Sequence, residues 1–288
     1  MLRDFLYHNT NVNFCILTRP YCATTSLCVL FSIFSKNKIK SIIIEKNERT
    51  KYSAKQRLFL NNQKALLSEL SFKFTILFQK ESITLIHYYL LDKLTNFFNL
   101  LFWNNLKAIS KLLQFELQYV QTHSSEECTS IIQDNKLKYA FLSSSSWILG
   151  SNFLKSINLK IINIHPGHLP RHRSLDSIPW SIYSAEPLFI TSHFVDSGID
   201  TGPILIRQPI HSFKYDFLTY IKLRIIWIKV LHINKTLSLL QVNSISPTEQ
   251  DLSHGEHHTP MSYAQLKDIN RRLSEKFDSE NYSNPIII

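Results

Sequence analysis

Glycine is scarce in this chain, with only 5 glycines among 288 residues. Cysteine is scarce as well: the four cysteines show neither metal-site pairing nor the density of a disulfide framework, so we expect reduced thiols and a cytoplasmic protein. No uncharged apolar run reaches the roughly 18 residues of a membrane span. Arg3 and Asp4 interrupt the first apolar stretch, so we expect neither a membrane segment nor a signal peptide.

The remaining composition is that of a globular protein. Hydrophobic residues make up 44% and charged residues 19%, which excludes the composition of a disordered chain. The net charge of +10 and the pI near 9.4 raise the question of a nucleic-acid partner. Because the lysines are scattered among Asn and Ile, a composition bias explains the charge better than a nucleic-acid-binding face.

The few glycines are concentrated in one part of the sequence. Gly150, Gly167, Gly198 and Gly202 fall in or just before residues 161–210. A chain so poor in glycine is expected to keep it where the backbone needs a positive φ or a close approach to another group. This concentration predicts a functional site.

The order of apolar segments predicts an α/β fold. A strand at residues 13–18, a helix at 22–35 and a strand at 39–45 form a βαβ unit, which requires a parallel sheet. Further strands are expected at 117–120, 139–143, 160–164, 189–194 and 204–210. We therefore expect a Rossmann-like domain at residues 11–212, with a mostly parallel sheet flanked by helices and a helical insertion at 46–115. A helical C-terminal extension would occupy residues 213–288.

Two details of the helices are also predicted. Ser124 and Glu127 fit a capping box at the start of a helix. In the amphipathic helix expected at 217–241, Lys222, Arg224 and Lys229 would lie on the wet side.

Four polar residues stand at the ends of short apolar strands. Asn163 and His165 are two residues apart, so their side chains point the same way from one strand. Asp200 follows after a helix at 177–185 and a strand that ends at His193 and Phe194, an order that returns it to the same sheet edge. Taken singly, each of these residues is more typical of a turn or of a buried strand histidine. An Asn-His-Asp set without a nearby Ser or Cys makes no covalent nucleophile and suits direct attack by a substrate amine.

The two motifs resemble a known signature. Asn163-Ile164-His165-Pro166 with Arg173, and the run His-Phe-Val-Asp-Ser-Gly-Ile-Asp-Thr-Gly-Pro at 193–203, are similar to motifs of the folate-dependent formyltransferases. This family includes glycinamide ribonucleotide, methionyl-tRNA and sugar N-formyltransferases and formyltetrahydrofolate deformylase. The resemblance implies transfer of a formyl group from 10-formyltetrahydrofolate to a primary amine of a small or nucleotide-linked acceptor, with no metal.

The resemblance also implies residue roles. Asn163 would bind the formyl oxygen, His165 would stabilise the oxyanion, Asp200 would orient His165 and relay a proton, and His193 would support Asp200. The folate would be bound by Ser146, Trp147, Ile148, Leu149, Val195, Asp196 and Gly198, and the acceptor by Gly167, Arg171 and Arg173.

Departures from the family pattern leave the acceptor open. The turn at residues 18–23 has no glycine, and Gly167 and Ser174 stand where the family has Ser and Gly, so glycinamide ribonucleotide is a doubtful substrate. A methionyl-tRNA acceptor, a deformylase that uses water, and a catalytically silent binding module of the same fold stay open as alternatives. The histidines at 254–258 are expected to form a solvated loop in preference to a metal site.

Overall fold

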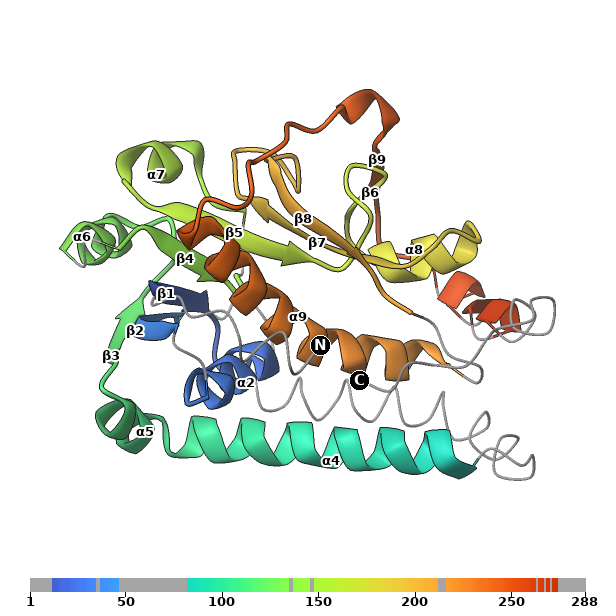
Figure 1. The fold of residues 1–288 in the computed structure, drawn as a ribbon, viewed down its shortest axis with the longest axis horizontal. Helices are drawn as coiled ribbons and strands as arrows, with labels where there is room; N and C mark the ends of the chain where they lie inside the picture. Colours follow the sequence, from blue (N-terminus) through green and yellow to red (C-terminus); the bar gives the residue numbers. More distant parts are fainter. Residues whose placement is uncertain are drawn as a thin grey trace.

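A seven-stranded sheet organises the chain (Figure 1). The computed structural model describes residues 12–34, 37–46, 82–134, 137–145, 148–211, 216–262, 264–266, 268–269 and 271–273. The strand order is β3-β2-β1-β4-β5-β7-β8; the first five strands are parallel, and β7 and β8 run antiparallel to their neighbours. The strands are β1 (Asn13–Thr18), β2 (Lys38–Glu45), β3 (Glu116–Val120), β4 (Tyr139–Leu142), β5 (Lys160–His165), β7 (Phe189–Phe194) and β8 (Ile204–Pro209).

Helices cover both faces of the sheet, as the alternation of strand side chains requires. Ile16 and Ile42 belong to one buried cluster, whereas their neighbours Leu17 and Ile43 belong to a second cluster on the opposite face. The first face is covered by α2 (Ala23–Ser32), α4 (Ser82–Asn104), α5 (Leu106–Leu113) and α9 (Leu218–Gln241), and the second by α6 (Glu126–Asp134) and α7 (Ser151–Ser156) (Figure 1). The predicted fold class, a mostly parallel sheet flanked by helices, is confirmed.

Helix α9 is more deeply buried than its sequence indicates. Lys222 is half exposed, as expected, but Arg224 is only 5% exposed and pairs with the buried Asp216. Lys229 is partly buried, and burial lowers its pKa. The prediction of a wet side is therefore wrong at Arg224 and Lys229, because α2 and α4 pack against the same helix and leave it little free surface.

The part of the chain after α9 is not helical throughout. The segment includes η1 (Leu252–His254) and β9 (Glu256–His258), and β9 pairs in parallel with β6 (His172–Ser174). Strand β6 lies in the connection between β5 and α8 (Ser177–Tyr183), next to the carboxyl end of β5. The C-terminal segment thus returns to the edge of the sheet where α/β proteins bind ligands.

Other local predictions have mixed outcomes. The capping residue of α6 is Ser125, whose Oγ accepts from the Cys128 amide at 3.2 Å, while Ser124 accepts from the Gly150 amide. In the insertion, α4 and α5 account for the helix expected at 91–115, and the helix expected at 51–70 lies outside the described residues. All four cysteines are free, and among the described helices none has the length and apolarity needed to cross a membrane.

Candidate active site

The carboxyl end of β5 presents two of the predicted site residues. Asn163 and His165 project from the same face of β5 as Ile161, which belongs to the second buried cluster. His165 is only 4% exposed. On the neighbouring strand β7, His193 is in register with Asn163, which brings a third predicted residue to the same place.

The loop between β7 and β8 brings Asp200 to these three residues. One carboxyl oxygen, Oδ1, lies 3.2 Å from Asn163 Nδ2 and 3.4 Å from His193 Nε2; the other, Oδ2, lies 3.3 Å from His165 Nδ1. The Ser174 amide of β6 donates to Oδ2 at 3.0 Å. The four predicted residues therefore form a single cluster around the Asp200 carboxyl group.

Close backbone approach, and not a positive φ, explains the glycines of this loop. A Cβ at Gly202 would lie 2.0 Å from the Phe194 carbonyl oxygen, and one at Gly198 would lie 2.1 Å from Thr201 Oγ1. No glycine has a positive φ, whereas Asp200 itself has a φ of 54°. Aspartate is one of the few residues that tolerate the left-handed region, so Asp200 can adopt this conformation in the loop.

The surroundings of Asp200 favour its ionised form. Burial raises the pKa of the carboxyl group, but the nearby His165 and the Ser174 amide lower it more, so the pKa lies well below its usual range. Burial lowers the pKa of His165, against the opposing effect of Asp200. The site thus holds a buried carboxylate with an imidazole against each of its oxygens.

Hydrogen-bond partners fix the orientation of the rings and the amide. His193 Nδ1 lies 2.9 Å from the Phe194 carbonyl oxygen, which only accepts, so the proton is on Nδ1 and Nε2 accepts from Asn163. Both N–H protons of Asn163 therefore have acceptors, His193 and Asp200. His165 is likewise engaged on both sides, because its Nε2 donates to the His172 carbonyl at 2.8 Å.

The residues predicted to bind the acceptor lie around this cluster. A Cβ at Gly167 would lie 2.6 Å from His165 Nε2, so the absence of a side chain leaves room for the ring. The Arg171 guanidinium forms ion pairs with Glu186, at 3.0 Å, and with Glu256, so it is already engaged. The Nε of Arg173 is buried and has no hydrogen-bond partner in the part of the chain that the structure describes.

The residues predicted to bind folate are only partly described. Ser146 and Trp147 lie outside the described residues. Leu149 is buried in the second cluster and Val195 packs against it, whereas Ile148 is 59% exposed.

The loop that contains the last two predicted folate residues is closed by its own hydrogen bonds. Asp196 accepts from the Gly198 amide at 3.1 Å and from Thr201 Oγ1 at 2.7 Å. The Asp196 carboxyl group and the Gly198 amide are therefore engaged within the loop itself.

Several residues at the site had not been predicted. The His172 carbonyl accepts from His165, Gln250 bonds to the Asp200 loop, and His258 bonds to His172. The expectation of a solvated histidine loop is wrong for His258, which is 7% exposed and bonded to His172. The described residues contain no group of three or more His, Cys, Asp or Glu arranged to hold a metal ion.

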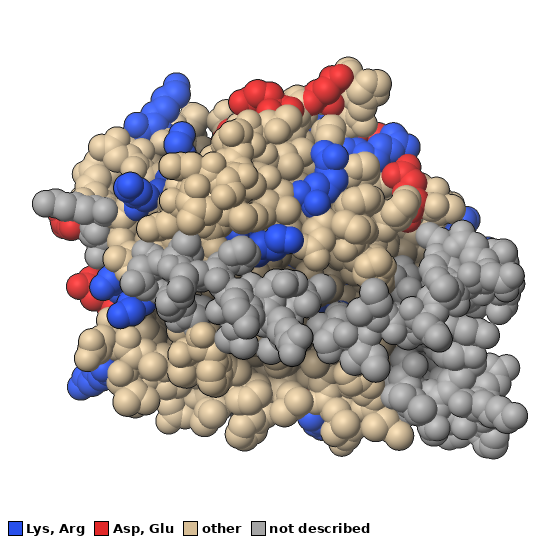
Figure 2. Space-filling model, in the orientation of Figure 1, with Lys and Arg blue, Asp and Glu red and all other residues tan. Residues whose placement is uncertain are grey.

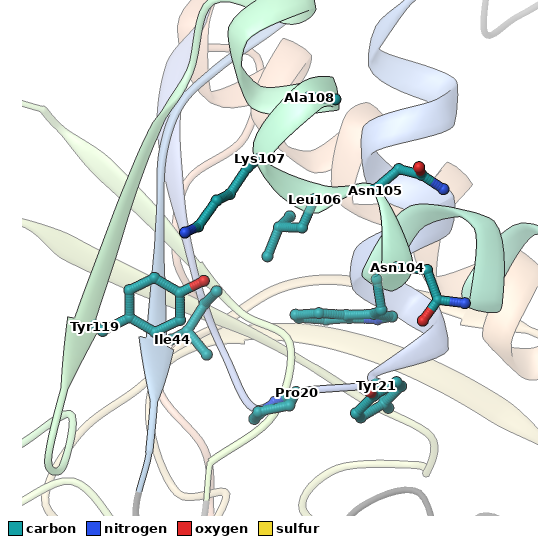
Figure 3. Close-up of a pocket in the computed structure, with 10 residues that line it drawn as sticks. Pro20, Tyr21, Ile44, Asn104, Asn105, Leu106, Lys107, Ala108 and Tyr119 are labelled. Atoms are coloured by element: carbon teal, nitrogen blue, oxygen red, sulfur yellow. The ribbon is translucent and has the colours of Figure 1, made fainter.

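A pocket of about 510 Å³ lies farther along the same sheet edge (Figure 3). It is bounded by the end of β1, by Ile44 of β2 and by the junction of α4 and α5, and its lining includes Tyr21, Trp103, Tyr119 and Lys107. Asn163 and Leu17 of β1 are both in register with Leu142 of β4, so the ends of β1 and β5 are two strand spacings, about 10 Å, apart.

The sequence matches known formyl transferases over the segment that carries the site. Residues 106–225 match the family model described as formyl transferase. Phosphoribosylglycinamide formyltransferase of Bacillus subtilis is 37% identical over 79 residues, 27% of this chain and 40% of that protein. Methionyl-tRNA formyltransferase of Solibacter usitatus is 30% identical over 105 residues, 36% of this chain and 34% of that protein. The alignments thus span well under half the length of these relatives.

The fold matches solved structures over most of the chain. A sugar N-formyltransferase from Shewanella has a TM-score of 0.53 at 14% identity and covers 92% of this chain and 88% of its own. Glycinamide ribonucleotide transformylase 1 from Symbiobacterium toebii has a TM-score of 0.53 at 12% identity, with 85% and 96% coverage. These structures confirm the Rossmann-like fold that the sequence predicted.

Proposed function

From the similarity of residues 106–225 to formyl transferases, we propose that this chain is an enzyme that transfers a formyl group from 10-formyltetrahydrofolate to a primary amine. The observation that carries the proposal is the convergence of Asn163, His165 and His193 on the Asp200 carboxylate. These residues come from β5, β7 and the loop after β7, and they meet at the edge where α/β sheets bind ligands.

The cluster supplies the two functions that direct acyl transfer needs. A negative charge develops on the formyl oxygen, and an amide N–H aimed at it typically contributes about 3 kcal/mol. Asn163 donates this hydrogen bond in the proposal, in exchange for one of its two present bonds to His193 and Asp200.

The second function is proton transfer. The attacking amine must lose a proton, and Asp200, ionised at neutral pH, accepts it. His165 Nδ1 is 3.3 Å from Asp200 Oδ2, so it shares the positive charge that arrives with the proton until the leaving nitrogen takes that proton up. This division of roles fits a His165 whose two ring nitrogens already have partners.

The exposed Ile148 and the neighbouring loop from Val195 to Gly198 support a site for the folate. When bound, 10-formyltetrahydrofolate supplies the formyl group. Ile148 is exposed beside the buried Leu149, and the loop from Val195 to Gly198 is closed by its own hydrogen bonds, so these residues would hold a flat heterocyclic ring.

The pocket in Figure 3 supports an acceptor that is linked to a nucleotide. Tyr21, Trp103 and Tyr119 offer ring faces, on which a base stacks with about 1–3 kcal/mol. Lys107 lines the same pocket, and Arg19 lies between it and the catalytic cluster, bonded to Ser144 of the loop after β4. An acceptor with its amine at Asn163 and its base in the pocket would place its phosphates near these cations.

The test is to measure tetrahydrofolate release with a panel of primary amines, each with and without an attached nucleoside diphosphate. The proposal predicts release that depends on an amine, formation of the formamide, and loss of both in Asn163→Ala. Release of formate without any amine would indicate hydrolysis instead. Turnover retained in Asn163→Ala would refute the assignment of the site.

A further inference from the structure

The C-terminal segment, residues 248–259, contacts the loop that carries Asp200 and the connection between β5 and α8; we call it the strap. Thr248 pairs with Ile204 through two backbone hydrogen bonds of 2.8 and 2.9 Å, and Glu256–His258 pairs with β6. In Figure 1 the strap runs from the end of α9 past β8 to β6, so it connects two regions that are distant in sequence.

The first contact of the strap fixes the backbone of the Asp200 loop. Gln250 Nε2 lies 3.0 Å from the Asp200 carbonyl oxygen and 2.6 Å from that of Gly202, so both amide protons have acceptors in this loop. The left-handed backbone of Asp200 is costly for a residue other than glycine and persists only where its surroundings hold it. Gln250 is one of the groups that hold it.

The second contact fixes His165 through β6. The His172 carbonyl accepts from His165 Nε2 at 2.8 Å, and the Ser174 amide donates to Asp200 Oδ2 at 3.0 Å, so this short strand orients both catalytic groups. Among the described strands, β9 is the only partner of β6. The position of β6 therefore depends on the strap.

Side chains strengthen this second contact. His172 is fully buried and bonds through Nδ1 to His258 Nε2 at 2.8 Å and through Nε2 to Glu186 at 2.8 Å. Trp180 stacks on the His258 ring, with centroids 4.8 Å apart and planes at 11°. His258 of the strap is thus held between His172 of β6 and Trp180 of α8.

The contact between the two histidines accommodates one proton. The Glu186 carboxylate requires a proton on His172 Nε2, so a single proton is left to lie between His172 Nδ1 and His258 Nε2. Burial and the neighbouring His172 lower the pKa of His258, with Arg171 and His257 adding to the effect and Glu256 opposing it. In the neutral pair, His258 Nε2 donates this hydrogen bond and His172 Nδ1 accepts it.

We propose that Gln250 and His258 are positioning residues of the formyl-transfer site: the strap holds Asp200 and His165 in the geometry that the reaction needs. This inference rests on the proposed function. The segment after α9 thus contributes to the site, although it lies outside both motifs of residues 163–203.

The test compares His258→Ala, His258→Gln and Gln250→Ala with His254→Ala, a strap residue whose side chain is 82% exposed. The substrates are 10-formyltetrahydrofolate and the amine that the panel identifies. We expect kcat to fall by up to about 100-fold in His258→Ala and Gln250→Ala, with the KM for folate little changed, because the loss is one of alignment. Since a glutamine amide can also donate to His172 Nδ1, His258→Gln should recover most of the rate.

A second readout does not depend on activity. The imidazole NMR signals of His165 should shift in His258→Ala and stay in place in His254→Ala, even if wild-type protein transfers no formyl group. Such a shift in an inactive protein would refute the proposed function while supporting the strap. Unchanged His165 signals and kcat in His258→Ala, or equal losses of kcat and Tm in His258→Ala and His258→Gln, would overturn the inference.

Discussion

Replacing Gly202 by alanine is expected to disable the site while the fold persists. A Cβ at this position would lie 2.0 Å from the carbonyl oxygen of Phe194, and real Cβ contacts essentially never fall below 3.0 Å. The two backbone segments must therefore separate by at least 3.0 − 2.0 = 1.0 Å. Because the clash is with backbone, no change of rotamer relieves it.

The displacement would reach Asp200, which precedes Gly202 by two residues. Its carboxyl oxygens lie 3.2 Å from Asn163 Nδ2 and 3.3 Å from His165 Nδ1, so a further 1 Å exceeds hydrogen-bond distance. A misplacement of this size costs about 100-fold in rate. The added methyl group should also lower the free energy of unfolding by about 1–3 kcal/mol.

The assay is kcat/KM for formyl transfer together with thermal unfolding. Gly150→Ala is the matched control, since its Cβ would approach no atom closer than Ser124 Oγ at 3.9 Å. A folded Gly202→Ala protein as active as Gly150→Ala would refute the reasoning that the close approach of this loop to β7 sets the position of Asp200.

Three further predictions concern stability and the acceptor. Burial lowers the pKa of His232 from 6.5 to about 4, so the unfolded chain takes up the proton first as pH falls; stability should drop by up to about 3 kcal/mol between pH 6.5 and 4, and His232→Leu should flatten this slope in chemical denaturation. Lys107→Ala should raise the KM for a nucleotide-linked acceptor by about 5-fold and leave that for folate unchanged, whereas Lys111→Ala on the same helix should change neither. Arg224→Ala leaves the Asp216 carboxylate buried without its guanidinium and should cost about 3–5 kcal/mol in denaturant unfolding. An unchanged dependence of stability on pH in His232→Leu would contradict the first prediction, and equal KM values for the two lysine variants the second. A loss in the free energy of unfolding below about 1 kcal/mol in Arg224→Ala would contradict the third.

The parts of the fold that depend on local pattern were predictable. The isoleucine-rich runs at Ile42–Ile44 and Ile161–Ile164 are strands, as their apolar continuity indicates for a parallel sheet covered on both faces. The motifs also indicated that Asn163, His165 and Asp200 meet, because strand ends of one sheet share an edge. The pattern could not predict the partners of the His165 ring, whose two nitrogens are both engaged.

Residues that depend on long-range contacts were missed for a physical reason. Gln250 lies 50 residues from Asp200, and His258 lies 86 residues from His172. Nothing in a polar segment rich in histidine shows that one of its rings is buried against a tryptophan. Arg224 was likewise placed on a wet face, because its buried partner Asp216 is not marked by helical spacing.

The distribution of charge is consistent with the composition bias inferred from the sequence. On the face shown in Figure 2, Lys and Arg side chains are scattered among other residues, and Asp and Glu side chains interrupt them. A continuous basic stripe of the kind that follows a nucleic-acid backbone is not visible on the described part of this face.

The most direct test of the central claim is single-turnover formyl transfer by Asp200→Asn. The substitution keeps the size of the side chain but places an amide where one carboxylate oxygen now accepts from Asn163 or Ser174. If Asp200 accepts the amine proton and orders the cluster, the rate of formamide formation should fall by about 1,000-fold, with the fold and folate binding retained. A rate within about threefold of wild type would contradict the assignment of this carboxylate as the centre of the site.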